Sequence, residues 1–155
     1  MNLKVQTDYA LRVLLFLAHK GEQASVEEIA SAYGISKDHL FKVVQQLGRF
    51  GYVTSRAGRH GGVSLRKKPE TIRIDQVVAQ FEGRNGVLAC VDDPGVCILE
   101  PGCVLRNVLI KAEAAFYDTL GQLSIADVIK PNAVRQGGGV YNLTIKRSGK
   151  SPIGP

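Results

Sequence analysis

The sequence lacks several features that would define its class directly. Its 155 residues include no tryptophan, and the longest apolar run near the start, residues 13–18, is far too short to cross a bilayer. No small-residue cleavage site follows that run. We therefore expect a cytoplasmic protein with no membrane partner. The chain also has no Gly-rich nucleotide loop, catalytic triad or second cofactor motif, so we do not expect an enzyme.

Cysteine is absent except in one stretch of fourteen residues. Cys90, Cys97 and Cys103 have the spacing C-x6-C-x5-C. Reducing conditions disfavour disulfides and an odd number leaves one thiol unpaired, so metal or redox chemistry is more typical. Structural zinc sites usually use closely paired ligands that this stretch lacks, whereas an iron–sulfur cluster accepts wider spacing. Spacing alone leaves a cluster, zinc, a bare thiol sensor or structural cysteines open, and a cluster would need a fourth ligand.

Positive charge is concentrated in one part of the chain. The net charge is +6, but residues 37–73 carry nine basic and only two acidic residues, whereas residues 87–130 carry three basic and six acidic ones. A basic segment favours a polyanionic partner, although charge alone is equally typical of a solvated face.

The first part of the chain has the pattern of short amphipathic helices. Thr7 is expected to cap the first helix and Gly21 to end it. Ser25 begins a capping box for the second helix, which should end at Gly34. Ser36 is expected to cap a third helix. Two short helices joined by a Gly-containing turn predict a helix-turn-helix motif, whose second helix presents its first residues to the major groove of DNA.

Residues 52–65 change from helical to strand periodicity. We expect strands at 52–55 and 63–65, joined by a turn that carries basic residues among three glycines. A basic hairpin after a helix-turn-helix motif predicts a winged helix, in which the glycines let the backbone approach DNA and the arginines supply charge. The predicted DNA-contacting residues are Ser36, Lys37, His39, Lys42, Arg56, Arg59 and His60.

A long apolar stripe follows the cysteines, from Val104 to Leu123. It is wider than a small winged helix needs. The alternative is packing on its own domain, but we favour a homodimer interface, because a two-fold protein matches a palindromic DNA site. The expected fold is mainly α with a β-hairpin wing: a winged helix-turn-helix plus a long dimerisation helix.

The predicted organisation has four parts. A winged-helix DNA-binding domain covers residues 1–86, and a cysteine loop covers 87–103. The dimerisation helix and a short C-terminal helix, capped by Ser124 and Asp127, cover 104–130. Residues 131–155 are Gly-rich, basic and without helical periodicity, so we expect a flexible tail.

Several segments together resemble a known family over roughly residues 1–130. They are "LKVQTDYALRVLLFLA", "AYGISKDHLFKVVQQLGRFGYV", "GRHGGVSL", and the three cysteines followed by a long helix. The combination is similar to the NsrR/IscR-like iron–sulfur winged-helix repressors, and most similar to their nitric-oxide-sensing members. The resemblance implies a homodimeric repressor that binds palindromic double-stranded DNA. The alternatives are an iron- or cluster-status regulator of the same family and, from another class, a small iron–sulfur electron-transfer protein.

The resemblance also implies a set of cluster ligands. IscR-like members have a histidine three residues after the third cysteine, where this chain has Arg106, which argues against a histidine-ligated [2Fe–2S] cluster. NsrR-like members have an aspartate in the first helix that ligates the cluster of the other subunit, and Asp8 matches it. The implied site is a [4Fe–4S] cluster held by Cys90, Cys97, Cys103 and Asp8 of the partner subunit. Without the resemblance, Asp8 is an ordinary acidic residue near a helix start.

Overall fold

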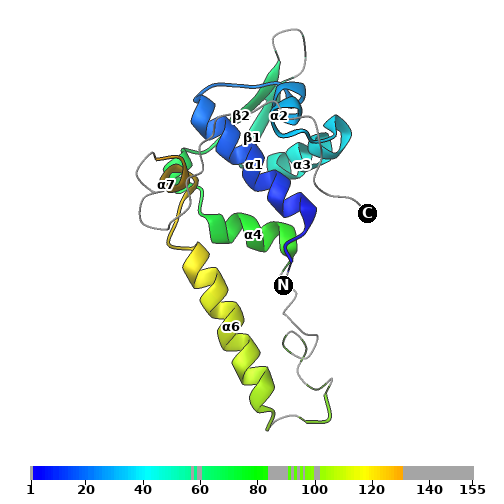
Figure 1. Cartoon of the computed structure of the whole chain (residues 1–155), viewed down its shortest axis with the longest axis vertical. Helices are drawn as coiled ribbons and strands as arrows, with labels where there is room; N and C mark the ends of the chain where they lie inside the picture. The colour runs from blue at the N-terminus through cyan, green and yellow to red at the C-terminus, as the bar shows by residue number, and fades with distance from the viewer. Residues whose placement is uncertain are drawn as a thin grey trace.

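The protein is mainly helical and has one β-hairpin, which confirms the predicted fold class (Figure 1). This is a computed structural model, and it describes residues 2–56, 58, 61–83, 91, 93, 95, 97–99 and 102–130. The elements are α1 (Val5–Lys20), α2 (Val26–Tyr33), α3 (Lys37–Arg49), β1 (Val53–Arg56), β2 (Gly62–Leu65), the 3-10 helix η1 (Pro69–Thr71), α4 (Ile74–Glu82), α6 (Val104–Leu120) and α7 (Ile125–Ile129). None of the helices described is long and apolar enough to span a membrane.

The ends of α1 and α2 follow from local sequence, with one exception. Gly21 and Gly34 end the two helices with φ of 73° and 65°, a left-handed conformation that glycine adopts without strain. The Ser25 hydroxyl accepts a hydrogen bond from the backbone N–H of Glu28 at 3.0 Å, which is one half of the predicted capping box. The Glu28 carboxylate instead accepts from the Lys20 ammonium at 2.7 Å. The prediction that Thr7 caps α1 is wrong. The helix begins at Val5, and Thr7 is fully buried inside its first turn.

One hydrophobic core joins the helices to the hairpin. The residues of α3 at helical spacing, Leu40, Val43, Val44 and Leu47, are all buried. They pack in one cluster with Leu14 of α1, Ile29 of α2 and the start of β1. Removal of this apolar surface from water is the main force that fixes α3 against α1 and α2. The opposite face of α3 therefore remains available for a partner.

The hairpin is held to the helices by backbone pairing. β1 and β2 are antiparallel, with Val53 opposite Leu65, and each strand lies within one residue of its predicted position. Ala24, in the turn between α1 and α2, exchanges two backbone hydrogen bonds with Val63 at 2.8 and 3.0 Å. A side chain at Gly62 would lie 3.0 Å from the Ala24 carbonyl oxygen, so glycine permits this close approach. The base of the wing is thereby fixed relative to α2 and α3.

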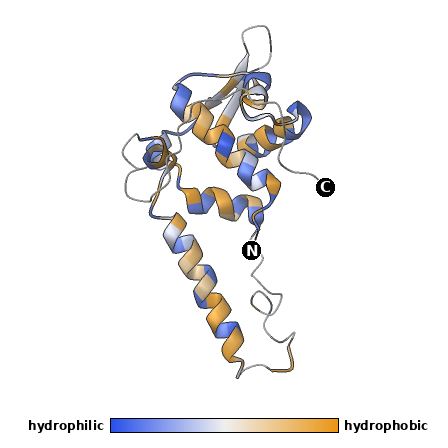
Figure 2. Cartoon of the chain, viewed as in Figure 1, coloured by the Kyte–Doolittle hydropathy of each residue, from blue (hydrophilic) through white to orange (hydrophobic). Residues whose placement is uncertain are grey.

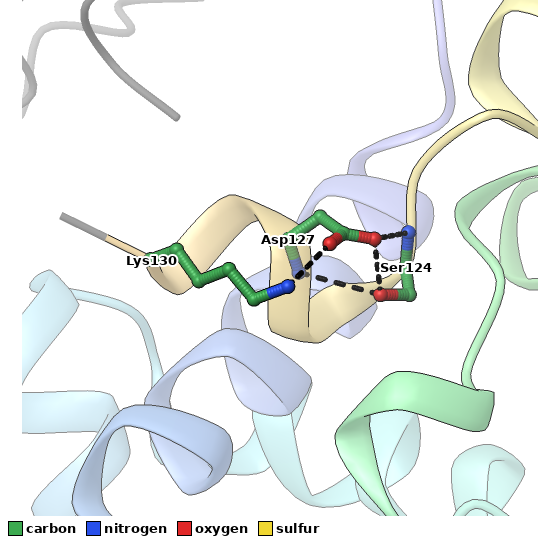
Figure 3. A network of polar contacts seen from close by, with 3 residues as sticks. All are labelled: Ser124, Asp127 and Lys130. Carbon is green, nitrogen blue, oxygen red and sulfur yellow. Dashed lines mark hydrogen bonds and ion pairs between the residues drawn. The ribbon is translucent and has the colours of Figure 1, made fainter. Parts of the chain in front are cut away.

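The short helix α7 returns the chain to this core. Ser124 and Asp127 form the predicted capping box, and the Lys130 ammonium donates to the Asp127 carboxylate at 2.8 Å (Figure 3). Lys130 and then Ser124 hold the pKa of Asp127 well below its usual range. Ile125 is fully buried, and its N–H donates to the Ile72 carbonyl at 2.9 Å. Helix α7 thus packs with the winged-helix body, although the predicted division into domains placed it with α6.

Helix α6 projects away from the winged-helix body (Figure 1). It contacts α4, but none of its 17 residues is buried. Its first half is the more apolar (Figure 2), and Val104 and Leu105 are 74% and 60% exposed. The apolar stripe predicted from the sequence therefore exists, and α4 covers only a small part of it. The predicted tail, residues 131–155, lies outside the described residues.

Candidate DNA-binding surface and cluster site

The exposed side of α3 carries the polar residues that the sequence assigned to DNA contact. Lys37, His39 and Lys42 are all exposed in the first two turns of the helix. Ser36 occupies the N-cap position and is exposed, and its side chain makes no capping hydrogen bond. The structure therefore brings these four residues together at one end of α3, which is the end that a helix-turn-helix motif inserts into the major groove.

Lys37 is joined to a residue that the sequence analysis missed. Its ammonium lies 2.9 Å from the carboxylate of Glu27 in α2, and both side chains are mostly exposed. Hydrogen bonding to the carboxylate raises the pKa of Lys37, and the same contact lowers the pKa of Glu27. Lys37 is therefore fully charged at neutral pH. A solvated ion pair of this kind is weak, so Lys37 can exchange Glu27 for a DNA phosphate.

The wing extends the basic surface beyond α3. Arg56 is exposed at the end of β1, whereas Arg59 and His60 lie outside the described residues. Past β2, the Lys67 ammonium lies 4.7 Å from the centre of the Tyr52 ring. This contact fixes a cation close to the hairpin. The sequence analysis did not single out Lys67, because only the fold brings Tyr52 under it.

The cysteine site is described only in part. Cys90 lies outside the described residues, and Cys97 and Cys103 are free thiols that are half-buried. Cys103 is the N-cap residue of α6, and its side chain makes no capping hydrogen bond. Within the described ranges, no three histidine, cysteine, aspartate or glutamate side chains are close enough to hold a metal ion. Two thiols without a disulfide, one of them at a helix N-terminus, nevertheless fit the soft donors that an iron–sulfur cluster requires.

Arg106 has a structural contact at the position where a histidine ligand was considered. Its guanidinium donates to the backbone carbonyl of Val91 at 3.4 Å. This weak contact joins the first turn of α6 to the cysteine loop. Arginine at this position therefore contacts the loop backbone, and it offers no lone pair to a metal.

Asp8 lies on the solvent side of α1, and about half of its side chain is exposed. The Arg12 guanidinium Nε lies 2.9 Å from both Asp8 carboxylate oxygens. Arg12 also lies 5.5 Å from the centre of the Tyr33 ring at the end of α2. The sequence analysis missed Arg12, although its i,i+4 spacing from Asp8 is a recognised signal for an ion pair. The Asp8 carboxylate is therefore half-exposed and forms a solvated ion pair with Arg12.

A second polar cluster ties α1 to the end of α4. The Thr7 hydroxyl donates to the Glu82 carboxylate, which also accepts from the Lys4 backbone N–H at 2.8 Å. The Lys4 ammonium donates to the carbonyls of Phe81, at 3.4 Å, and Glu82. Glu82 is the last residue of α4, five positions before the cysteine loop at residues 87–103. Thr7 is next to Asp8, so this cluster fixes the helix turn that presents Asp8.

Comparisons with known proteins show which family the chain resembles over most of its length. A family model named Rrf2, described as an iron-dependent transcriptional regulator, matches residues 3–131. The HTH-type transcriptional regulator NsrR of Bacillus licheniformis is 44% identical over 132 residues, which covers 83% of this chain and 92% of that protein. The protein of the same name from Bacillus subtilis is 41% identical over 133 residues, with 84% and 91% covered.

Solved structures support the fold independently. The structure of CymR, the global cysteine regulator of B. subtilis, has a TM-score of 0.69 at 23% identity and covers 83% of this chain and 95% of that one. T. potens IscR has the same TM-score at 21% identity, with 91% and 95% covered. At these identities the likeness concerns the fold alone.

Proposed function

The chain belongs to the Rrf2 family of transcriptional regulators, and on that premise we propose that it is a homodimeric, nitric-oxide-responsive repressor that carries an iron–sulfur cluster. It is a DNA-binding regulator and not an enzyme. The observation that carries the proposal is identity of 40% or more to regulators named NsrR over more than four fifths of the chain. In these bacterial relatives the DNA lies in the cytoplasm, and we place the protein there.

The surface described above supports DNA binding by α3 and the wing. Ser36, Lys37, His39 and Lys42 lie at one end of α3, and Arg56 extends the cationic surface along β1. Arg59 and His60 continue that surface in our proposal. Lysine and arginine that neutralise phosphates make binding strongly dependent on salt. A dimer presents two such helices, so we propose a palindromic site with half-sites about one helical turn apart.

Helix α6 supplies the surface for the dimer. Val104, Leu105 and Val108 are all more than half exposed, and no residue of α6 is buried in the part of the chain that the structure describes. A contiguous apolar surface of this kind marks an interface in a water-soluble protein. A second copy of α6 satisfies both the apolar chemistry and the two-fold symmetry that a palindrome requires.

The proposed cluster is a [4Fe–4S] centre, with [2Fe–2S] as the less favoured form. Cys90, Cys97 and Cys103 would hold it, and Asp8 of the partner subunit would complete it. When bound, the cluster supplies an iron atom that a diatomic molecule can reach, because a hard carboxylate is a weak ligand beside soft sulfur. Asp8 suits this role because it points outward from α1 and its own partner, Arg12, is solvated.

The proposed response to nitric oxide depends on the link that Asp8 makes between the two subunits. A carboxylate that binds the partner's site ties α1 of one subunit to the cysteine loop of the other. Its release lets Asp8 return to Arg12 and frees the two subunits to change the spacing of their α3 helices. A palindrome of fixed spacing then binds less tightly. A coupling free energy of about 1 to 3 kcal/mol would weaken binding about 5- to 150-fold.

The experiment that tests the proposal compares three forms of the protein under anaerobic conditions. Cluster-loaded, apo and nitric-oxide-treated protein are each titrated against a duplex that the loaded protein has selected from a randomised pool. We expect the loaded form to bind and nitric oxide to lower the affinity within the range given above. Equal affinity in all three forms would rule out sensing through a cluster.

Two controls separate the alternatives. Iron chelation without nitric oxide tests the iron- or cluster-status regulator, which should lose or change DNA binding under chelation but ignore brief exposure to nitric oxide. Iron, zinc and sulfide analysis distinguishes [4Fe–4S], [2Fe–2S] and zinc. A protein that holds a cluster and selects no DNA sequence would fit the electron-transfer alternative.

A further inference from the structure

The exposed face of α3 carries a phenylalanine among charged and polar side chains. Phe41 is 52% exposed, although Leu40 beside it is completely buried. Lys37 and Gln45, one turn before and after Phe41, are also exposed. Phe41 is not a member of the hydrophobic core, and it makes no ring contact with the other aromatic residues of the described chain. The fold therefore does not require a phenyl ring at this position.

The position of Phe41 matters because it is the fifth residue of α3. The first residues of a recognition helix are those that reach base edges in the major groove. Lysine contacts to phosphate fix the helix on DNA but carry no sequence information. Lys37 and Lys42 are suited to that positioning task, which leaves other residues on the same face to distinguish bases.

The chemistry of the Phe41 ring restricts which DNA base it can recognise. A phenyl group neither donates nor accepts a conventional hydrogen bond, so it cannot pair with the polar edges of guanine, adenine or cytosine. The major groove offers one apolar group, the C5 methyl of thymine, and phenylalanine is among the side chains that contact it. The surrounding cations argue for DNA as the occupant, because an apolar protein partner would have to bury Lys37 and Lys42 as well.

We infer that Phe41 is a base-reading residue that selects thymine by contact with its C5 methyl group in each half-site. The inference rests on the proposed DNA-binding function and adds the base and the group recognised. Its energetic basis is removal of the methyl group and the ring from water. Burial of one methyl group corresponds to about a 4-fold change in affinity, and to about 15-fold when both half-sites lose it.

The test replaces thymine by uracil, which lacks only the C5 methyl group. The cluster-loaded protein first selects a duplex from a randomised pool, and each thymine of the half-site is then changed to deoxyuridine symmetrically. We expect one or two adjacent thymines per half-site at which the symmetric change lowers affinity about 15-fold, and smaller effects elsewhere. Uniform tolerance of uracil at every thymine would overturn the inference, and this result needs no protein variant.

Variants then assign the effect to the ring. Phe41→Ala should bind thymine- and uracil-containing duplexes equally, and Phe41→Leu should keep part of the difference because leucine retains an apolar contact. Val128→Ala removes an exposed apolar side chain from α7 and serves as the control, with the difference expected to remain complete. Thermal melting confirms that each variant is folded. If Phe41→Ala and Phe41→Leu both keep the full uracil effect, another residue recognises the methyl group.

These outcomes separate the two levels of the argument. A protein that selects no sequence would contradict the proposed function, and the role of Phe41 with it. A protein that selects a sequence and remains indifferent to the C5 methyl group would contradict the role of Phe41 alone.

Discussion

Replacement of Asp8 by alanine distinguishes a cluster ligand from an ordinary helix residue. In the structure, the Asp8 carboxylate forms an ion pair with Arg12, and the Asp8 and Arg12 side chains are 49% and 43% exposed. A solvated i,i+4 pair of this kind contributes about 0.3 to 0.5 kcal/mol. A purely structural Asp8 therefore predicts that Asp8→Ala lowers the melting temperature by no more than about 4 °C.

Arg12→Gln provides a matched control, because it removes the same ion pair and leaves the carboxylate in place. It also removes the contact with Tyr33, so its effect on stability should be at least as large as that of Asp8→Ala. The ligand role predicts the opposite order for function. Asp8→Ala should give a more labile cluster and about 5- to 150-fold weaker DNA binding by the loaded protein, while Arg12→Gln retains a stable cluster.

The assay combines three measurements on wild type and the two variants. Thermal unfolding of the apo proteins gives the loss of melting temperature caused by each substitution. The visible absorbance of the cluster under anaerobic conditions gives the lifetime of the cluster, and fluorescence anisotropy gives DNA affinity. Equal cluster lifetimes and DNA affinities for Asp8→Ala and Arg12→Gln would refute the ligand assignment. Asp8 would then have only its ion pair, and the fourth ligand would have to come from elsewhere in the chain.

Three further predictions concern the fold and the assembly. Thr7→Val keeps the shape of a fully buried side chain but removes the hydrogen bond to Glu82. It should therefore lower the free energy of unfolding by about 1 to 2 kcal/mol. Urea titration measures this change, and an unchanged unfolding midpoint would contradict it. Val108→Glu should place a charge in the proposed dimer interface and give a monomer in light scattering at concentrations where wild type is a dimer. Because the folded-state pKa of Asp127 is depressed, its stabilising contribution is present above the unfolded pKa of about 3.9 and is lost as pH falls further through the acid range. Asp127→Asn should therefore reduce the pH dependence of the melting temperature between about pH 5 and 2. An unchanged pH dependence would exclude Asp127 as a cause of acid destabilisation.

The sequence predicted those parts of the fold that depend on local chemistry. Gly21 and Gly34 end helices because each must adopt a positive φ, and the Ser124–Asp127 capping box is complete within four residues. The buried face of α3 followed from spacing alone. These features need no knowledge of distant residues, so pattern and position were sufficient to identify them.

The features that the sequence could not predict depend on contacts between distant residues. Thr7 had the composition of an N-cap, but the fold buries it against Glu82, 75 positions away. Similarly, Lys37 was correctly placed on the exposed side of α3, but its partner Glu27 lies on another helix. The three cysteines could be grouped by spacing, whereas the proposal of Asp8 as a fourth ligand rests on a resemblance to other proteins. Such pairings are set by tertiary packing, which propensity and periodicity do not encode.

The attachment of α6 also makes the helix a lever arm. Its C-terminal end is fixed to the body through Ile125, whereas Cys103 stands at the far end, about 25 Å away for 17 residues at 1.5 Å each. On that length, a rotation of about 5° at the fixed end would displace Cys103 by about 2 Å, which is close to the length of a metal–sulfur bond. At the pivot, a side chain on Gly121 would lie 3.2 Å from the Asp75 carboxylate carbon. The close packing at Gly121 therefore helps to set the position of the Cys103 thiol at the opposite end of the helix.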